Sequence, residues 1–378
     1  MRLRSYLAIA VSLALGILAA IFSSQMTQTY HVSPVPSLSV SSDHATASLP
    51  DSSAKSRTSV GSIASSRPET GPSPAKTKAL RAETSSTTAR QSPSPSTPSL
   101  TEEDALNISA SRLRAALVNI ICYVPAGSGL HSISGSGVFI DPRGVILTNA
   151  HIAQYFLLAD RGVSCSIRSG TPAKGRYDAA LIFISPEWIR ANVGVLTETA
   201  PNGTGEYDFA FLAVTKSTTD TPLPASFPSI PIAQTPPTPG TPVVIASYGA
   251  QFLNSAQVES ALFPTVVFGS VKGVFTFKTN TIDLIALGGS AAAQEGSSGG
   301  GVADSSGDLV GTITTSTVDG PTSSRSLNAI TASYIRAEYA SETGQALDIL
   351  LAKPTSSAIA DFAPQMPALE STLTLPLP

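Results

Sequence analysis

The feature that most constrains the fold is a series of short apolar runs that end at glycine, proline or polar residues. The runs are rich in Val, Ile, Phe and Thr, which are enriched in β-strands, and no regular helical pattern separates them. They cover residues 118–124, 137–140, 145–148, 163–167, 179–184, 209–214, 242–247, 265–268, 281–286, 309–315 and 326–330. Many short strands without intervening helices favour an all-β sandwich or a pair of barrels over a parallel α/β sheet.

Helical patterns occur at the two ends of this β-rich region. Apolar residues from Leu106 to Leu117 recur at helical spacing and predict a helix over 101–117, for which Ser99 and Glu102 fit a capping box. The expected organisation is an anchor at 1–23, a linker at 24–100, a folded domain at 101–352 that closes with short helices at 332–339 and 345–351, and a flexible tail at 353–378.

The first residues have the pattern of an export signal. Arg2 and Arg4 precede an uncharged run over 6–22, which is long for a signal-peptide core and at the short limit for a membrane-spanning helix. This charge distribution places the N-terminus in the cytoplasm. Leu18 fits poorly at the −3 position of a cleavage site that would follow Ala20. We therefore favour an uncleaved membrane anchor with an extracytoplasmic domain over a cleaved signal and a secreted enzyme.

The linker and the charge distribution limit the partners of the folded domain. Ser, Thr or Pro occupies 37 of the 70 positions in 31–100, so little apolar surface is available to offset the entropic cost of ordering, and we expect a disordered tether. Residues 1–100 carry nine Lys/Arg and four Asp/Glu, a balance of +5, which leaves −8 for the rest of a chain whose net charge is −3. An acidic folded part argues against nucleic acid as a partner.

The clearest chemical motif is the glycine-rich segment 296–301 (GSSGGG), which contains Ser298. The flanking glycines expose the serine hydroxyl and let backbone N–H groups converge on one point, as an oxyanion hole requires. Apolar strand-like segments lie on both sides of the motif, which argues against a merely flexible loop. Ser298 is therefore a candidate nucleophile.

Two further polar residues adjoin apolar strands. His151 follows an apolar run and could accept the proton of Ser298, whereas His131, the other histidine after residue 100, lies in a Gly/Ser loop that suits a general base less well. Asp208 begins an apolar strand, where burial is costly unless a partner such as an imidazole N–H is present. Asp178 has a similar local pattern. A buried structural histidine and an ordinary strand-end aspartate are the alternatives for these residues taken singly.

Together these segments resemble the trypsin-like serine peptidases, in particular the bacterial HtrA/Deg type. The segment 147–151 (LTNAH) is similar to the family's histidine motif, 208–212 (DFAFL) to its aspartate strand, and 296–300 (GSSGG) to its nucleophile motif. The segments 136–140 (SGVFI) and 307–311 (GDLVG) fit as well. The resemblance spans about 118–336, and three motifs in the right order are more specific than any one.

The resemblance implies two six-stranded antiparallel barrels and a catalytic triad of His151, Asp208 and Ser298, with Asp178 in the strand before the catalytic acid. The backbone N–H groups of Gly296 and Ser298 would form the oxyanion hole. No metal and no cofactor are implied. The expected activity is that of a serine endopeptidase acting on proteins or peptides through an acyl-enzyme.

The family's layout also implies a substrate pocket and a possible disulfide. Ala292 would lie near the floor of the pocket, with Thr312 and Thr314 in its wall, so a small or medium apolar side chain is expected before the scissile bond. Cys122 and Cys165 fall on strands that are neighbours in this fold, so they form either a disulfide or two buried thiols.

Two departures and two alternatives complete the interpretation. Ser297 stands where trypsin has an aspartate, so activation by an ion pair to a new N-terminus is not expected, and the 42 residues after Arg336 are too few for a PDZ module.

An α/β-hydrolase is excluded because its histidine follows the serine, and no histidine follows Ser298. A degenerate protease domain used for binding is the non-enzymatic alternative.

Overall fold

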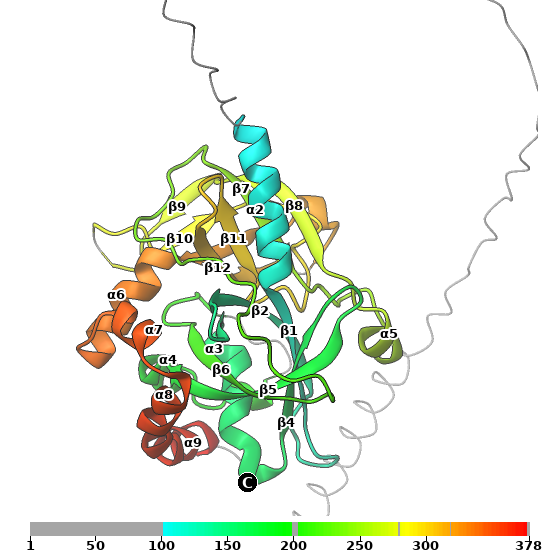
Figure 1. Ribbon diagram of the computed structural model, residues 1–378, viewed down its shortest axis with the longest axis vertical. Coiled ribbons are helices and arrows are strands. Elements are labelled where there is room, and N and C mark those ends of the chain that lie inside the picture. Colours follow the sequence, from blue (N-terminus) through cyan, green and yellow to red (C-terminus); the bar gives the residue numbers. More distant parts are fainter. Residues whose placement is uncertain (1–100, 199–202, 279, 318, 376–378) are drawn as a thin grey trace, which may run out of the picture. The chain divides into compact units, whose positions relative to one another are not determined.

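A computed structural model describes residues 101–375 apart from 199–202, 279 and 318, and this part of the chain forms two β-sheets with helices packed around them (Figure 1). The predicted anchor and linker lie outside the described residues. No helix among the described residues is long and apolar enough to cross a membrane.

The first half of the folded region is a closed six-stranded barrel with the strand order β1-β2-β3-β6-β5-β4. All of its strand pairs are antiparallel, as predicted. The strands are β1 (Leu117–Tyr123), β2 (Ile133–Asp141), β3 (Val145–Thr148), β4 (Ser164–Ser169), β5 (Lys174–Ile184) and β6 (Ala210–Ser217). Each overlaps one of the apolar runs identified in the sequence.

The second half is a seven-stranded antiparallel sheet with the order β8-β7-β11-β12-β13-β10-β9, so the expected second six-stranded barrel is wrong in strand number and closure. Its strands are β7 (Pro242–Ser247), β8 (Thr265–Ser270), β9 (Gly273–Phe275), β10 (Leu284–Ala286), β11 (Gly301–Asp304), β12 (Leu309–Ser316) and β13 (Leu327–Thr331). Only two residues join the edge strands β8 and β9. The N–H of Val271 donates to Thr241, just before β7, and the N–H of Lys272 donates to Ala286 at the end of β10. A short covalent link therefore connects the two edges, and no ladder closes the sheet.

Helix α2 (Glu102–Ala116) precedes the barrel and confirms the expected helix, although its cap differs. The hydroxyl of Thr101, and not that of Ser99, accepts from the backbone N–H of Asp104, whose carboxylate in turn accepts from the backbone N–H of Thr101. The helix packs on β2, β7 and β11 (Figure 1). A methyl group on Gly301, the first residue of β11, would collide with Leu113, so glycine permits this close approach. Helix α2 thus lies against the strand that follows the Ser298 turn.

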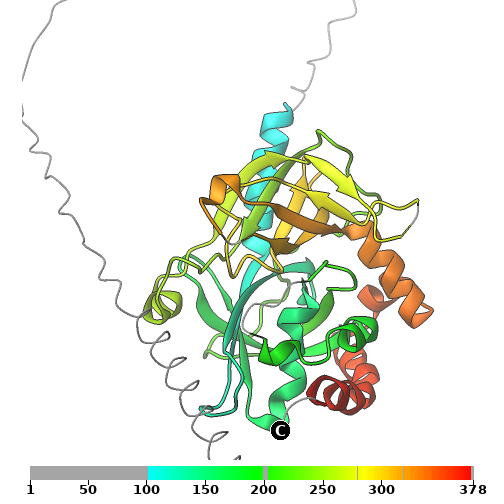
Figure 2. The same ribbon diagram turned by 180° about the vertical axis from the view of Figure 1, so that it is seen from behind.

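The expected flexible tail after residue 352 is instead helical. Helices α6 (Ala332–Thr343) and α7 (Leu347–Ala352) are followed by α8 (Thr355–Phe362) and α9 (Met366–Thr374). Helix α8 packs on β5, and α9 packs on α4 (Pro186–Ala191) and on the 3-10 segment η1 (Gln154–Arg161). Ala358, Phe362 and Leu373 are buried in these contacts. Figure 2 shows these helices beside the barrel from behind. A few apolar residues on short helices bury this segment, and the sequence pattern did not reveal them.

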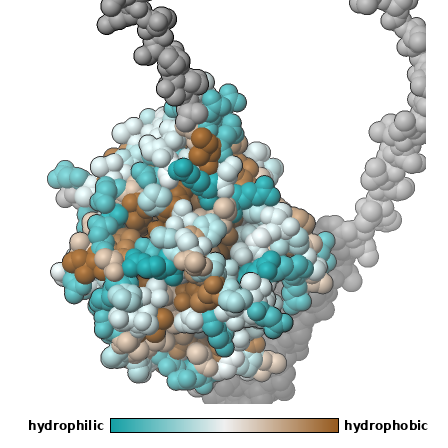
Figure 3. Space-filling view, viewed as in Figure 1, coloured by the Kyte–Doolittle hydropathy of each residue, from teal (hydrophilic) through white to brown (hydrophobic). Residues whose placement is uncertain are grey.

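The surface shows no dominant apolar face in the view of Figure 3. Hydrophobic residues appear there in separate patches between hydrophilic ones, as on most protein surfaces. The most exposed aromatic side chains lie outside the segments that contain His151, Asp208 and Ser298. They are Phe252, Phe263, Phe268 and Phe275.

Cys122 in β1 and Cys165 in β4 are directly opposite each other and form a disulfide. The bond joins two neighbouring barrel strands, with a sequence separation of 43 residues. No free cysteine remains, because the chain contains only these two.

We expect the double variant Cys122→Ser/Cys165→Ser to be less stable than the wild type. In the chain-entropy description, a disulfide that closes a loop of this length destabilises the unfolded chain by about 4 kcal/mol. Thermal unfolding with and without a reductant measures the effect. The reductant should lower the Tm of the wild type and leave that of the double variant unchanged. Equal Tm values for the oxidised wild type and the double variant would contradict a stabilising disulfide.

Candidate active site

His151 lies on α3 (Ala150–Ala153), immediately after β3, and its ring faces Asp208. The distance from His151 Nδ1 to Asp208 Oδ2 is 2.8 Å, and the backbone N–H of His151 donates to Asp208 Oδ1 at 3.0 Å. The side chain of Asn149 donates to the backbone carbonyl of Asp208. The turn after β3 therefore binds both the carboxylate and the backbone of Asp208, which fixes the orientation of the imidazole.

Asp208 is buried just before β6, and its carboxylate accepts hydrogen bonds from two different parts of the fold. Besides its bonds to His151, its Oδ2 accepts a 2.7 Å hydrogen bond from the hydroxyl of Thr314 on β12. Burial by itself raises the pKa of a carboxyl, but the interactions with His151 and Thr314 outweigh it and hold the pKa of Asp208 below its usual value. Asp208 is thus an ionised carboxylate whose lone pairs face one imidazole and one hydroxyl.

The alternative aspartate and histidine that the sequence offered, Asp178 and His131, do not join this pair. Asp178 is on β5 and pairs with Lys216 at 3.1 Å. His131 lies in an exposed loop, where its backbone carbonyl accepts from the hydroxyl of Tyr155. The structure brings Asp208, and not Asp178, to His151.

Ser298 lies in a tight turn between β10 and β11 that backbone hydrogen bonds hold to both the barrel and the second sheet. Its carbonyl accepts from the N–H of Ser136 on β2 at 2.7 Å, and the next N–H, of Gly299, donates to Ile313. Gly299 has a φ of +84°, and a methyl group there would collide with the carbonyl of Ser136 and the hydroxyl of Thr148. Only glycine allows this turn to approach β2 so closely.

The peptide groups before Ser298 are oriented by two hydrogen bonds. The carbonyl of Glu295 accepts from the N–H of Ala250 at 2.8 Å, and the carbonyl of Gly296 accepts from the hydroxyl of Ser136 at 2.8 Å. Because N–H and C=O point in opposite directions across a trans peptide, the N–H of Gly296 points away from Ala250. Neither this N–H nor that of Ser298 donates to another described residue. Both remain available to bind an oxyanion.

Ser136 is a site residue whose role the sequence did not reveal. It is fully buried, and its hydroxyl accepts from the N–H of Tyr248 at 2.8 Å while donating to the carbonyl of Gly296. Its carbonyl also accepts from the hydroxyl of Thr148 at 2.7 Å. The segment 136–140 fitted the family resemblance, but these contacts, up to 160 residues away, have no local signal.

Ser297, at the position of the trypsin aspartate, makes a neutral contact. It is buried, and its hydroxyl lies 3.0 Å from that of Ser247, which donates to it. No ion pair therefore holds this position, in agreement with the departure noted in the sequence.

The hydroxyl of Ser298 makes no hydrogen bond to His151 in the part of the chain that the structure describes. Ser298 is partly exposed, and His151 retains a 27 % exposed side chain. Such bonds are often absent or long before substrate binds. The histidine and aspartate are thus joined, and the serine is held by its backbone.

The three residues expected to bind substrate are all buried. Ala292 and Thr312 are fully buried, and the hydroxyl of Thr312 has no hydrogen-bond partner among the described residues. The hydroxyl of Thr314 is taken up by Asp208, so this residue orients the acid. Their contact with a substrate side chain stays a prediction. No group of three His, Cys, Asp or Glu that could hold a metal ion occurs among the described residues.

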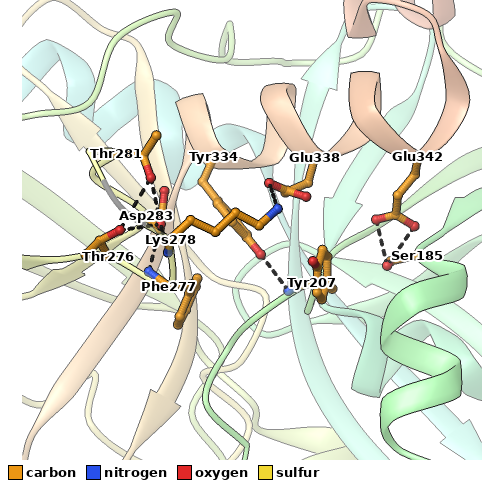
Figure 4. A network of polar contacts seen from close by, with 10 residues as sticks. All are labelled: Ser185, Tyr207, Thr276, Phe277, Lys278, Thr281, Asp283, Tyr334, Glu338 and Glu342. Carbon is orange, nitrogen blue, oxygen red and sulfur yellow. Dashed lines mark hydrogen bonds and ion pairs between the residues drawn. The ribbon is translucent and has the colours of Figure 1, made fainter.

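Helix α6 supports the segment that carries Asp208 (Figure 4). The hydroxyl of Tyr334 accepts from the N–H of Tyr207 at 3.0 Å, and Tyr207 has a left-handed φ of 57°. One turn further along α6, Glu338 pairs with Lys278 at 2.7 Å, and the ammonium of Lys278 lies 5.3 Å from the centre of the Tyr207 ring. The unusual backbone of Tyr207, next to Asp208, is therefore held by α6 and by the loop after β9.

The last turn of α6 contains a carboxyl group, that of Glu342, whose pKa is raised. Glu342 accepts hydrogen bonds from the hydroxyl of Ser185 at 2.9 and 3.0 Å (Figure 4). Burial raises the pKa of Glu342 to about 7. The contact between α6 and the start of α4 thus includes a group whose charge changes near neutral pH.

Comparison with known proteins agrees with this geometry. Residues 135–311 match the family model of the trypsin-like peptidase domain, and the match runs from β2 into β12. It includes His151, Asp208 and Ser298. This part of the chain is a trypsin-like serine peptidase domain, and the protein is a serine-type peptidase.

Solved structures similar to this chain include two of the Rv3671c protease. The active form, from M. tuberculosis, is 19 % identical and covers 67 % of this chain and 92 % of its own, with a TM-score of 0.40. The inactive form is 17 % identical and covers 63 % of this chain and 93 % of its own, also with a TM-score of 0.40. The search of curated proteins found no match.

We expect Ser136→Ala to lower kcat by about 10- to 100-fold, somewhat less than the loss of a whole oxyanion donor. The substitution leaves the carbonyl of Gly296 and the N–H of Tyr248 without their hydroxyl partner, while the backbone hydrogen bond from Ser136 to Ser298 remains. Steady-state kinetics on a peptide substrate measure the effect. Ser134→Ala is the matched control, because Ser134 lies on the same strand and its hydroxyl accepts from Asn119 alone among the described residues. Equal kcat values for the two variants would contradict a role of Ser136 in holding the turn.

Proposed function

We propose that this peptidase is an endopeptidase that cleaves peptide bonds with Ser298 as nucleophile, His151 as general base and acid, and Asp208 as the group that orients His151. The observation that carries the proposal is the short contact from His151 Nδ1 to the buried Asp208 carboxylate, next to a glycine turn that leaves two N–H groups unpaired. The match to the trypsin-like peptidase domain supports the same roles.

The proposed reaction follows from which nitrogen of His151 already forms a hydrogen bond and which is free to take a proton. Asp208 accepts a hydrogen bond from the Nδ1–H of His151, so Nε2 is left to take the proton of Ser298 as its Oγ attacks the substrate carbonyl. The N–H groups of Gly296 and Ser298 stabilise the oxyanion. His151 then protonates the leaving amine, which departs and leaves an acyl-enzyme. Water, deprotonated by His151, releases the acid product and restores Ser298.

The substrate is proposed to be an extended polypeptide with a small or medium apolar residue before the scissile bond. No Asp or Glu lies beside Ala292 in the sequence, and Glu295 is exposed, so a cationic side chain would lack a buried partner. Cleavage of an unbiased peptide library reads this preference directly, and a dominant preference for Lys or Arg would exclude it.

The proposed location is outside the cytoplasm, with residues 1–23 as the membrane anchor. The Arg pair before the apolar run supports this orientation, and the Cys122–Cys165 disulfide suits an oxidising compartment. Full-length protein should stay in the membrane fraction, from which protease added outside releases the folded domain. A mature N-terminus near residue 24 would instead establish a cleaved signal.

The triad is tested by covalent labelling and by substitution. A fluorophosphonate should label the intact protein on Ser298, as located by mass spectrometry. Ser298→Ala and His151→Ala should each lower kcat by about 10⁴- to 10⁶-fold, and Asp208→Asn by about 10⁴-fold. Ser298→Ala should leave the Tm nearly unchanged, because Ser298 is partly exposed and its hydroxyl has no hydrogen-bond partner among the described residues.

His131→Ala and Asp178→Asn are the matched controls, because both residues lie away from the site and should leave kcat unchanged. Activity in Ser298→Ala, or its loss in His131→Ala, would contradict the assignment. A binding module without catalysis is the second candidate, favoured only by the missing Ser298–His151 hydrogen bond. It predicts a folded wild-type protein that neither cleaves peptides nor reacts with the fluorophosphonate.

A further inference from the structure

Arg325 has a buried guanidinium whose hydrogen bonds go to neutral acceptors. Its side chain lies just before β13, and the residue is only 5 % exposed. It donates to the backbone carbonyls of Ala293 at 2.7 Å and Gly320 at 2.9 Å and to the side-chain oxygen of Gln251. No carboxylate among the described residues forms an ion pair with it. A buried charge is costly, so a guanidinium in this position requires all of these acceptors to be held in place.

The acceptors of Arg325 belong to three separate loops. Gln251 lies in the loop after β7, Ala293 in the loop between β10 and β11, and Gly320 in the loop between β12 and β13. The guanidinium carbon also lies 5.8 Å from the ring centre of Phe252 in the first of these loops. A planar group with several donors can bind such divergent carbonyls at once, which an ammonium cannot do as well. Arg325 therefore joins three loops that have few regular backbone bonds to each other.

Two of these loops meet at the peptide that would supply one oxyanion donor. Gln251 follows Ala250, whose N–H holds the carbonyl of Glu295, and Ala293 precedes Glu295 by two residues. Gly249 lies so close to the side chain of Gln294 that a methyl group there would collide with it. Arg325 thus binds both sides of the contact that turns the Gly296 N–H away from Ala250.

The turn has no ionic support of its own, since Ser297 is neutral and pairs with Ser247. We propose that Arg325 is a positioning residue that clamps the 248–252 and 291–296 segments and so keeps the N–H of Gly296 directed at the oxyanion site. The role assigned to this N–H rests on the proposed function. Without the guanidinium, the Glu295–Gly296 peptide can rotate and remove one of the two donors.

The kinetic test compares Arg325→Ala and Arg325→Lys with Arg336→Ala. Arg336 is a matched control because it also binds two backbone carbonyls, those of Ile232 and Ala233, but lies away from the Ser298 turn. We expect kcat to fall about 10²- to 10³-fold in Arg325→Ala, the range for loss of one oxyanion donor, and less in Arg325→Lys. Arg336→Ala should change the Tm and leave kcat of the folded protein unaltered. Wild-type kcat in Arg325→Ala would overturn the proposal.

Chemical rescue separates positioning from general destabilisation. Millimolar methylguanidinium, too dilute to unfold a protein, should restore part of kcat in Arg325→Ala and none in Ser298→Ala. A fall in kcat that methylguanidinium does not reverse, together with a Tm loss equal to that of Arg336→Ala, would reduce Arg325 to a structural residue and overturn its positioning role.

Hydrogen exchange tests the clamp independently of catalysis. In Arg325→Ala, the amides of 248–253 and 291–300 should exchange faster, whereas those of 145–148 in β3 should keep their wild-type protection. Unchanged protection of both loops would overturn the clamp. If the wild-type protein itself cleaves no peptide, the proposed function fails, and this exchange pattern still decides whether Arg325 holds the two loops.

Discussion

The rest of the site depends on one buried carboxylate, that of Asp208. It can be ionised inside the protein only because His151 and Thr314 satisfy it, and these two partners come from opposite halves of the fold. His151 follows β3 of the barrel, and Thr314 lies on β12 of the second sheet. Any movement of one half relative to the other would leave a buried charge without a partner, which is expensive. The requirement to satisfy Asp208 therefore also fixes the register between barrel and sheet.

The Ser298 turn is positioned differently, by backbone and hydroxyl groups. Ser136 binds both sides of the turn, α2 packs against Gly301 just beyond it, and Arg325 holds the loop before it. These contacts reach the turn from three directions, and only the Arg325 contact involves a charge. Under the proposed function, neutral contacts suit this turn, because an anion nearby would compete with the substrate oxyanion for the same N–H donors.

The sequence was most informative where a residue's role is local. Strands with β-branched and aromatic runs were predicted within a few residues, and His151, Asp208 and Ser298 could be proposed because each sits in a short motif. The strands Gly273–Phe275 and Gly301–Asp304 were missed because both are short and begin with a glycine. Ser136, Thr314 and Arg325 act through partners distant in sequence, at most 160 residues away, and no pattern marks such pairs. Helices α8 and α9 were missed because a few apolar residues are enough to dock them.

The same carboxylate links the site to acid stability. Because the pKa of Asp208 is lower in the folded protein than in the unfolded chain, its ionisation stabilises the fold above the unfolded value near 3.8, and this contribution is lost as the pH falls through the lower folded value. Asp208 is therefore fully charged throughout the range in which an imidazole titrates. Changes in activity between pH 5 and 8 must then originate in a group other than Asp208.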